Sequence, residues 1–200
     1  MAKKGRRSRS EKLAWIVSRV FDPVFEIPVL LGAAVYYALT NGMRFRFLIF
    51  LMVVNVFLPA VYMLRGLRNG SIADWDMTRR EERRGVYLFT VFMHLISVVF
   101  AFSIGKVVMG KILVIFWTLG LVFALVTRFW KISVHGGVNG VALAFFNHFW
   151  GWKDYWWLSI VVLVVLWSRV MIKKHTWSQV SIGTVLAVVW VEVGLRLVGL

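Results

Sequence analysis

The chain contains no cysteine among its 200 residues. Disulfide bonds and thiolate sites are therefore excluded, and the redox state of the compartment leaves no trace in the sequence. Charged residues are scarce as well, at 16%, whereas hydrophobic residues make up 60% of the chain. Because a soluble domain carries about 25% charged residues and a smaller apolar share, this composition indicates an integral membrane protein.

Acidic residues are the scarcest charged class. Only 9 Asp and Glu oppose 24 Lys and Arg, which gives a net charge of +15. In a soluble protein this excess would suggest nucleic acid as the partner. Here the cations lie in tails and loops beside apolar runs, so we expect a membrane lipid with an anionic headgroup, and no nucleic acid. The sequence carries no signal for an oligomeric state.

Residues 1–22 show neither the compact apolar stretch nor the small-residue cleavage site of a signal peptide. They begin with a cluster of cations: Lys3, Lys4, Arg6, Arg7 and Arg9. We predict a basic tail that leads into a short interfacial helix, followed by one membrane-embedded helical domain over residues 23–200. The helix could contact acidic lipid, but the simpler interpretation, which we favour, is an orientation signal.

Seven apolar stretches follow, and crossing a hydrocarbon core takes roughly 17 to 25 residues. Their approximate limits are 24–40, 45–64, 86–104, 112–128, 136–150, 155–172 and 178–198. Polar or glycine-containing segments separate them, as turns would. Since the fifth stretch is the shortest, we predict an all-α, polytopic transmembrane helix bundle of six to seven spans.

Each crossing switches sides. This places the amino terminus and the polar segments 65–85, 129–135 and 173–177 on one side, where they would form a single composite site. That side holds 18 of the 24 Lys and Arg, because the other has only Arg44, Arg46, Lys106, Lys111, Lys153 and Arg196. The positive-inside rule therefore predicts a multi-pass protein of the cell membrane with its amino terminus and polar clusters in the cytoplasm.

Four arginines crowd the segment between the second and third stretches: Arg79, Arg80, Arg83 and Arg84. Guanidinium groups bind phosphate oxygens through paired hydrogen bonds, so phosphate binding is one interpretation. A solvated charge run beside the membrane is the other, and taken alone we favour it. The nearby Asp74 and Asp76 would suit a magnesium-diphosphate site like that of intramembrane prenyltransferases, but the second aspartate motif of those enzymes is missing here.

Two other strings carry a more specific resemblance. Ser168-Arg169, five residues and then His175 resembles the third signature of the type 2 phosphatidic acid phosphatase superfamily, SRxxxxxHxxxD, up to its last position. The segment 132–135 is similar to the second signature, PSGH, and retains its Ser and His. The arginine segment is similar to the first signature, KxxxxxxRP, in role but not in spacing. The KISxH and HTxxQV strings of one branch both occur here, and the resemblance covers roughly residues 74–185.

The resemblance implies a metal-independent phosphatase that acts on a lipid phosphate through a phosphohistidine. His175 would be the nucleophile and His135 the general acid, with Arg169 and Ser133 in supporting roles. The substrate would be a phosphomonoester or diphosphate of a lipid, of the phosphatidate or polyprenyl type. The chemistry demands no metal, and we predict neither a metal nor any other cofactor.

The residues suit this chemistry independently of the resemblance. Cations would neutralise the phosphate oxygens, which is the dominant contribution in phosphoryl transfer. These cations are Arg169, Lys131, Arg79, Arg80, Arg83 and Arg84. Ser133 and the backbone amides near Gly136 would add donors at the positive end of a helix.

Gln179 lies four residues after His175, on the same helix face, and would hold the imidazole ring in place. It stands where the superfamily signature has Asp. An amide orients a ring but supplies no negative charge, and a comparable loss in a hydrolase triad costs about 10⁴ in rate. The alternative function is therefore a catalytically weak or inactive lipid-phosphate-binding protein.

The remaining polar residues in the apolar stretches have simpler interpretations. We predict that His94 and His148 serve packing or hydrogen bonding, and that Glu192 and Arg196 form an ion pair in the last stretch. Gly136 and Gly140 could also serve only to let two helices approach closely.

Overall fold

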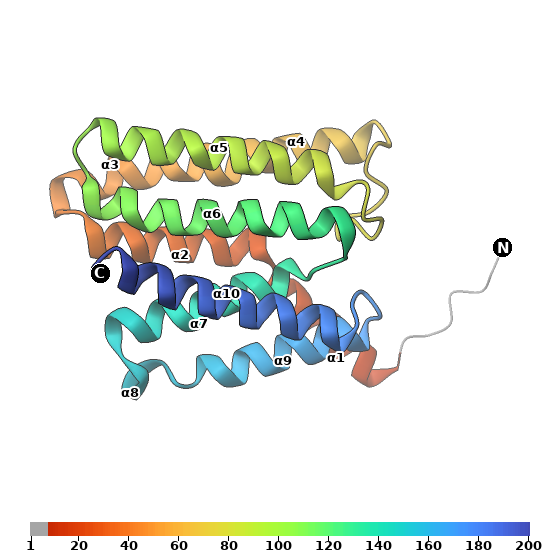
Figure 1. Ribbon diagram of the computed structural model, residues 1–200. Coiled ribbons are helices and arrows are strands. Elements are labelled where there is room, and N and C mark those ends of the chain that lie inside the picture. Colours follow the sequence, from red (N-terminus) through yellow and green to blue (C-terminus); the bar gives the residue numbers. More distant parts are fainter. Residues whose placement is uncertain (1–7) are drawn as a thin grey trace.

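The computed structural model describes residues 8–200, and these residues form helices and turns without a β-strand (Figure 1). Most of the predicted basic tail lies outside the described residues. The helices are α1 (Arg9–Val20), α2 (Pro23–Ala38), α3 (Asn41–Met52), the π-helical η1 (Val53–Phe57), α4 (Leu58–Arg68), α5 (Arg83–Ser103), α6 (Val107–Phe129), α7 (Val134–Trp150), α8 (Trp152–Tyr155), α9 (Leu158–Met171) and α10 (Trp177–Leu197).

Each of the seven predicted apolar stretches is largely helical. Four helical segments of the described chain are long and apolar enough to cross a membrane: Asn41–Arg68, Arg83–Ser103, Val107–Phe129 and Trp177–Leu197. The helices α2, α7 and α9 have 16, 17 and 14 residues, fewer than the roughly 20 of a typical span. The prediction of an all-helical membrane bundle is confirmed, with four segments of full spanning length.

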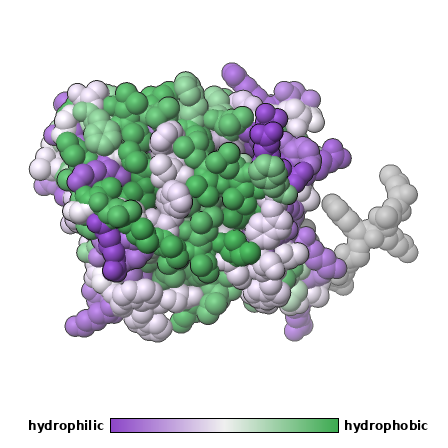
Figure 2. All heavy atoms as spheres, in the orientation of Figure 1, coloured by the Kyte–Doolittle hydropathy of each residue, from purple (hydrophilic) through white to green (hydrophobic). Residues whose placement is uncertain are grey.

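The surface supports a membrane location. Figure 2 shows an apolar band across the middle of the molecule, with hydrophilic residues gathered toward the two ends of the helices. Large apolar side chains on the helices are exposed, among them Phe45 at 73% and Leu125 at 62%. Water would make such exposure unfavourable, whereas lipid tails accommodate it.

Close helix contacts hold the bundle together. Helix α10 packs along α7, and α5 packs along α6 (Figure 1). A Cβ atom added at Gly136 would lie 2.8 Å from the carbonyl oxygen of Val180, and one at Gly140 would lie 2.7 Å from that of Thr184. The α7–α10 contact therefore requires these glycines, as expected for small residues between membrane helices.

The predicted polar segments do gather at one end of the bundle (Figure 1). Arg80 donates to the carbonyl oxygen of Phe129 at 2.8 Å, and Lys131 donates to that of Lys174 at 2.9 Å. The amino-terminal helix joins them, because it packs against α9. The short helix α8 lies at the opposite end.

Labelling from the two sides of a membrane tests this arrangement. Ser71 is exposed in the connection between α4 and α5, and Asp154 is exposed in α8 at the other end. Cysteines placed at Ser71 and Asp154 should react with an impermeant maleimide from opposite sides of intact cells. Labelling of both from the same side would contradict a bundle that crosses the bilayer along its helices.

Candidate active site

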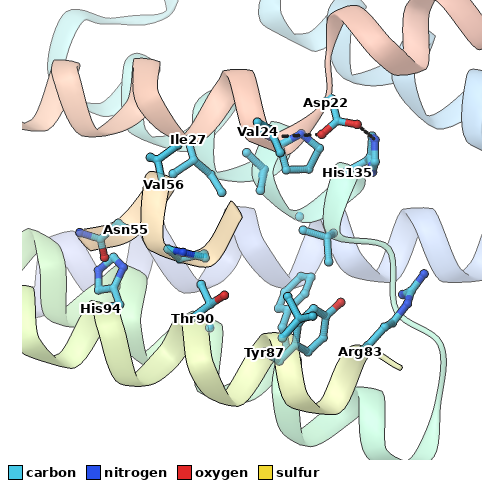
Figure 3. A pocket seen from close by; sticks show the side chains of 18 of the residues that line it. Asp22, Val24, Ile27, Asn55, Val56, Arg83, Tyr87, Thr90, His94 and His135 are labelled. Atoms are coloured by element: carbon cyan, nitrogen blue, oxygen red, sulfur yellow. Dashed lines mark hydrogen bonds and ion pairs between the residues drawn. The ribbon is translucent and has the colours of Figure 1, made fainter. Parts of the chain in front are cut away.

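A cavity of about 330 Å³ lies inside the bundle and has two unlike ends. At the polar end of the molecule its walls carry ionisable side chains: Asp22, Asp76, Arg83, His135, Arg169 and His175. Apolar residues of α2, α5, α6 and α7 line most of the rest. Figure 3 shows Asp22, His135 and Arg83 at one end, and Asn55 and His94 at the other. The cavity thus combines a charged end with an apolar remainder, as a site for an amphiphile would.

The turn between α9 and α10 positions His175 through a helix cap. Thr176 is the N-cap of α10, and its hydroxyl accepts a hydrogen bond from the backbone N–H of Gln179 at 3.3 Å. In return, the backbone N–H of Thr176 donates to Gln179 Oε1 at 3.2 Å. This reciprocal capping box is a strong local signal for a helix start, and it holds the amide of Gln179 in one orientation.

The same oxygen determines the tautomer of His175. Its Nδ1 atom lies 3.1 Å from Gln179 Oε1, which is the predicted contact between the two side chains. Because Oε1 only accepts, Nδ1 must carry the hydrogen, and Nε2 of the neutral ring keeps a lone pair. Burial, followed by the neighbouring Arg83 and Arg169, lowers the pKa of His175 to about 3. The ring is therefore neutral at physiological pH, the form that can attack phosphorus.

Arg169 is the most buried charge of the site, with 1% of its surface exposed. Its Nη1 atom donates to Ser18 Oγ at 2.6 Å and to Asp76 Oδ1 at 3.0 Å, and lies 3.4 Å from His135 Nε2. The Nε atom is buried and has no hydrogen-bond partner among the described residues. The guanidinium group therefore has a donor to spare for a ligand.

Asp76 is the centre of an ion-pair network. Its carboxylate lies 3.0 Å from Arg169, 2.8 Å from Arg19 and 3.5 Å from Lys174, and only 6% of the side chain is exposed. Burial alone would raise the pKa of Asp76, but Arg169 and Arg19 outweigh burial and lower the pKa to about 2. One charged carboxylate thus joins α1, α9 and the loop before α10.

Asp22 is a second buried carboxylate that pairs with groups of the site, and it lies beside His135. It is the N-cap of α2, where Oδ1 accepts from the backbone N–H of Val24 at 3.2 Å. Its Oδ2 atom lies 3.7 Å from His135 Nε2 and 3.3 Å from Arg19 Nη1 (Figure 3). Burial raises the pKa of Asp22, but the contacts with His135 and the Val24 amide lower it by more, so the pKa lies below its ordinary value.

The four arginines of the 79–84 segment separate in the structure. Arg83 is buried and lines the cavity, where Nη1 donates to the carbonyl oxygen of Ile132 at 3.0 Å. Arg80 holds the end of α6 through Phe129 and does not line the cavity. Arg79 and Arg84 are exposed, and Arg79 Nε lies 3.9 Å from Glu82. The structure therefore brings Arg83 to the two histidines and leaves the other three outside the cavity.

The other predicted phosphate-binding residues, Lys131, Ser133 and Gly136, do not line the cavity. Ser133 caps α7, and its hydroxyl accepts from the backbone N–H of Gly136 at 3.3 Å. Gly136 faces α10, as described above. Lys131 Nζ donates to Lys174 O, and burial together with neighbouring cations lowers the pKa of Lys131.

Sequence reasoning missed Ser18, Arg19 and Asp22, and it did not predict that Asp76 pairs with Arg169. The contacts that bring these residues into the site join positions far apart in the chain, as does the hydrogen bond from Arg169 to Ser18. A cue did exist: Arg19 and Asp22 have the spacing of facing residues at a helix end, beside a proline that starts the next helix.

The residues interpreted as structural behave in two ways. His148 Nδ1 lies 3.2 Å from Glu192, and Arg196 Nε donates to Glu192 at 2.9 Å, which confirms the predicted ion pair. His94 instead lines the inner end of the cavity, and its buried Nε2 atom has no partner among the described residues.

Together these groups provide a neutral imidazole, a second imidazole beside a carboxylate, and two buried guanidinium groups around one cavity. Such a set can perform nucleophilic and acid-base chemistry on an anionic group. Among residues 8–200 there is no cluster of three or more His, Cys, Asp or Glu that could hold a metal ion. Comparison of the chain with protein-family models, with curated proteins and with solved structures finds no match.

Acid unfolding tests the network around Asp76. A carboxyl group with a folded-state pKa of about 2 and an ordinary value of 3.8 stabilises the fold above about pH 4, and this contribution is lost as the pH falls toward 2. Asp76→Asn should therefore destabilise the protein at pH 7 by about 3 to 5 kcal/mol, the usual cost of breaking a buried pair. It should also flatten the decline in stability between pH 4 and pH 2. Thermal unfolding in detergent measures both.

Asp74→Asn is the matched control, because 39% of the Asp74 side chain is exposed and its partner is Lys174 alone among the cations. It should unfold within a few degrees of the wild type. Equal melting temperatures for Asp76→Asn and Asp74→Asn would show that the carboxylate of Asp76 does not hold this end of the bundle.

Proposed function

We propose that the protein is an integral-membrane lipid phosphatase of the type 2 phosphatidic acid phosphatase kind, acting through a phosphohistidine. The observation that carries the proposal is that His175, His135 and Arg169 line one cavity whose remaining walls are mostly apolar. The charged end of the cavity suits a phosphate group, and its apolar remainder suits the lipid tail. The spare donor on Arg169 Nε supports an anionic occupant.

The reaction has two steps. The lone pair on His175 Nε2 attacks phosphorus, the bond from phosphorus to the leaving oxygen breaks, and His135 gives that oxygen its proton. Water then attacks the phosphohistidine with His135 as base, which releases inorganic phosphate and restores both imidazoles. Arg169 and Arg83 stabilise the negative charge on the phosphoryl oxygens throughout.

We further propose that α2, α7 and α9 cross the membrane with the four longer segments, giving seven spans, the upper figure of the predicted six to seven. Support comes from their packing, because α7 lies along the spanning helix α10 and also contacts α2 and α9. The charge asymmetry of the sequence places the polar end in the cytoplasm of the cell, whereas the resemblance favours the outer face for many members.

A lipid-phosphate-binding protein without turnover is the second candidate, and Gln179 favours it. The amide holds His175 but offers no charge to stabilise a positive imidazole. Purified protein in detergent distinguishes the two functions. We expect release of inorganic phosphate, in the presence of a metal chelator, from one or more of phosphatidate, phosphatidylglycerol phosphate, polyprenyl phosphate and polyprenyl diphosphate. Tight binding of these lipids without release would support the second candidate.

Substitution of His175 tests the nucleophile. His175→Ala should lower turnover by at least about a thousandfold. Where catalytic residues act as one unit, the loss of any one of them abolishes most of the rate. Arg169→Lys should also be severe, since a point charge cannot replace a planar fork. His148→Ala is the control, because His148 contacts Glu192 outside the cavity and should keep wild-type turnover. Full activity in His175→Ala would rule out a phosphohistidine.

Restoring an acid at position 179 tests the role of the amide. Gln179→Glu retains the reach to His175, and its carboxylate should stabilise the positive charge that develops on the ring and speed formation of the phosphohistidine. Gln179→Asp is shorter and should help less. Rapid-quench measurement of the first step compares these variants with Gln179→Ala. Wild-type kinetics in Gln179→Ala would mean that this contact does not orient the nucleophile.

A further inference from the structure

A second pocket, of about 370 Å³, shares Asp76 with the apolar cavity. Its other walls come from α1 and from the turn between α9 and α10. They are formed by Glu11, Trp15, Arg19, Met171, Ile172, Lys173 and Lys174. The carboxylate of Asp76 therefore lies where a largely apolar cavity and a charged pocket adjoin.

The charged pocket has an excess of cations. Arg19 and Lys174 both contact Asp76, at 2.8 and 3.5 Å. The carboxylate of Glu11 is engaged in capping α1, where it accepts from the backbone N–H of Ser8 at 2.9 Å. Lys173 is exposed and forms no ion pair with any acid of residues 8–200. One cation of this pocket is therefore free to bind an anion.

The backbone presents Lys173 in an unusual way. Its φ angle is +56°, in the left-handed region where glycine is favoured at the end of a helix. The turn is held by the N–H groups of Lys174 and His175, which both donate to the carbonyl oxygen of Arg169, at 3.1 and 3.3 Å. Lys173 thus occupies a glycine-like position in the turn that connects Arg169, at the end of α9, to His175.

Hydrolysis at His175 would leave inorganic phosphate beside Arg169, with Asp76 as the neighbouring anion. The apolar cavity offers a doubly charged product no favourable route, because an ion is strongly disfavoured among apolar groups. The charged pocket adjoins the same carboxylate and contains the free lysine. A phosphate that exchanges with Asp76 on Arg169 would meet these cations next.

We propose that the pocket formed by α1 and the 172–174 turn is a binding site for a phosphate anion, in which the product of the reaction is held after it passes Asp76. The inference rests on the proposed function, since that function makes phosphate the product. The headgroup of an anionic lipid offers the same chemistry, so the experiment must separate the two sources.

Binding of radiolabelled inorganic phosphate to the purified full chain, in detergent without lipid phosphate, tests the site. Lys173→Glu should raise the dissociation constant about fivefold, since it replaces attraction by repulsion at an exposed position. The matched control is Lys153→Glu, which reverses an exposed lysine on α8 at the other end of the bundle and should bind phosphate as the wild type does. Melting temperatures of both variants should stay close to that of the wild type, because both side chains are exposed.

A lipid arm identifies the source of the anion. In nanodiscs, replacing phosphatidylcholine by phosphatidylglycerol should leave the Lys173-dependent binding of inorganic phosphate unchanged. Loss of that binding would show that a lipid headgroup occupies the pocket and would overturn the assignment to inorganic phosphate. Equal phosphate binding by Lys173→Glu and Lys153→Glu would overturn the site altogether, even if lipid phosphates are hydrolysed. Absence of hydrolysis with Lys173-dependent binding intact would instead refute the proposed function and leave the site standing.

Discussion

The buried contact between Arg169 and Asp76 is the constraint on which the polar end of this protein depends. Removing two charges from water costs several kcal/mol for each ion, and only close pairing with further hydrogen bonds offsets that cost. Arg169 finds its partners on α1 and in the 69–82 segment, through Ser18 and Asp76. Arg19 and Lys174 complete the neutralisation of the same carboxylate. The amino-terminal helix is consequently part of the site rather than a separate anchor, because its removal would take Ser18 from the guanidinium group and Arg19 from the carboxylate of Asp76.

The same cations set the protonation state of His175, which we propose as the nucleophile. His175 lies among Arg83 and Arg169 and is held by an uncharged amide, so no neighbouring anion favours its protonation. A carboxylate at position 179 would make the ring a stronger nucleophile, but it would also add negative charge where an anionic substrate must enter. In the mechanism that we propose, the amide therefore gives up part of the catalytic assistance and keeps the site attractive to phosphate.

The sequence predicted the features that depend on local pattern, and counting the apolar stretches predicted that the polar segments gather at one end. It missed the individual contacts between side chains of distant segments. Runs of apolar residues indicated the helices, and the spacing of His175 and Gln179 indicated their contact, because one helix turn determines it. The roles of the four arginines followed from no pattern, since the partners of Arg83, the carbonyl oxygens of Met77 and Ile132, lie in other segments, while the adjacent Arg84 is exposed. The partners of Arg169 lie 93 and 151 residues away, and sequence spacing carries no information at that range.

The two catalytic candidates differ most in the charges that surround them. Nε2 of His135 lies 3.7 Å from the carboxylate of Asp22 and 3.4 Å from Nη1 of Arg169, so a proton on this nitrogen would face a negative charge as well as a positive one. His175 faces the guanidinium groups of Arg83 and Arg169, and its own hydrogen is directed to the uncharged Gln179. Unlike surroundings are how one fold keeps one group as an acid and another as a nucleophile at the same pH. Asp22 comes from the start of α2 and Gln179 from the first turn of α10, so the capping residues of two helices would make the division of roles that we propose for the two imidazoles.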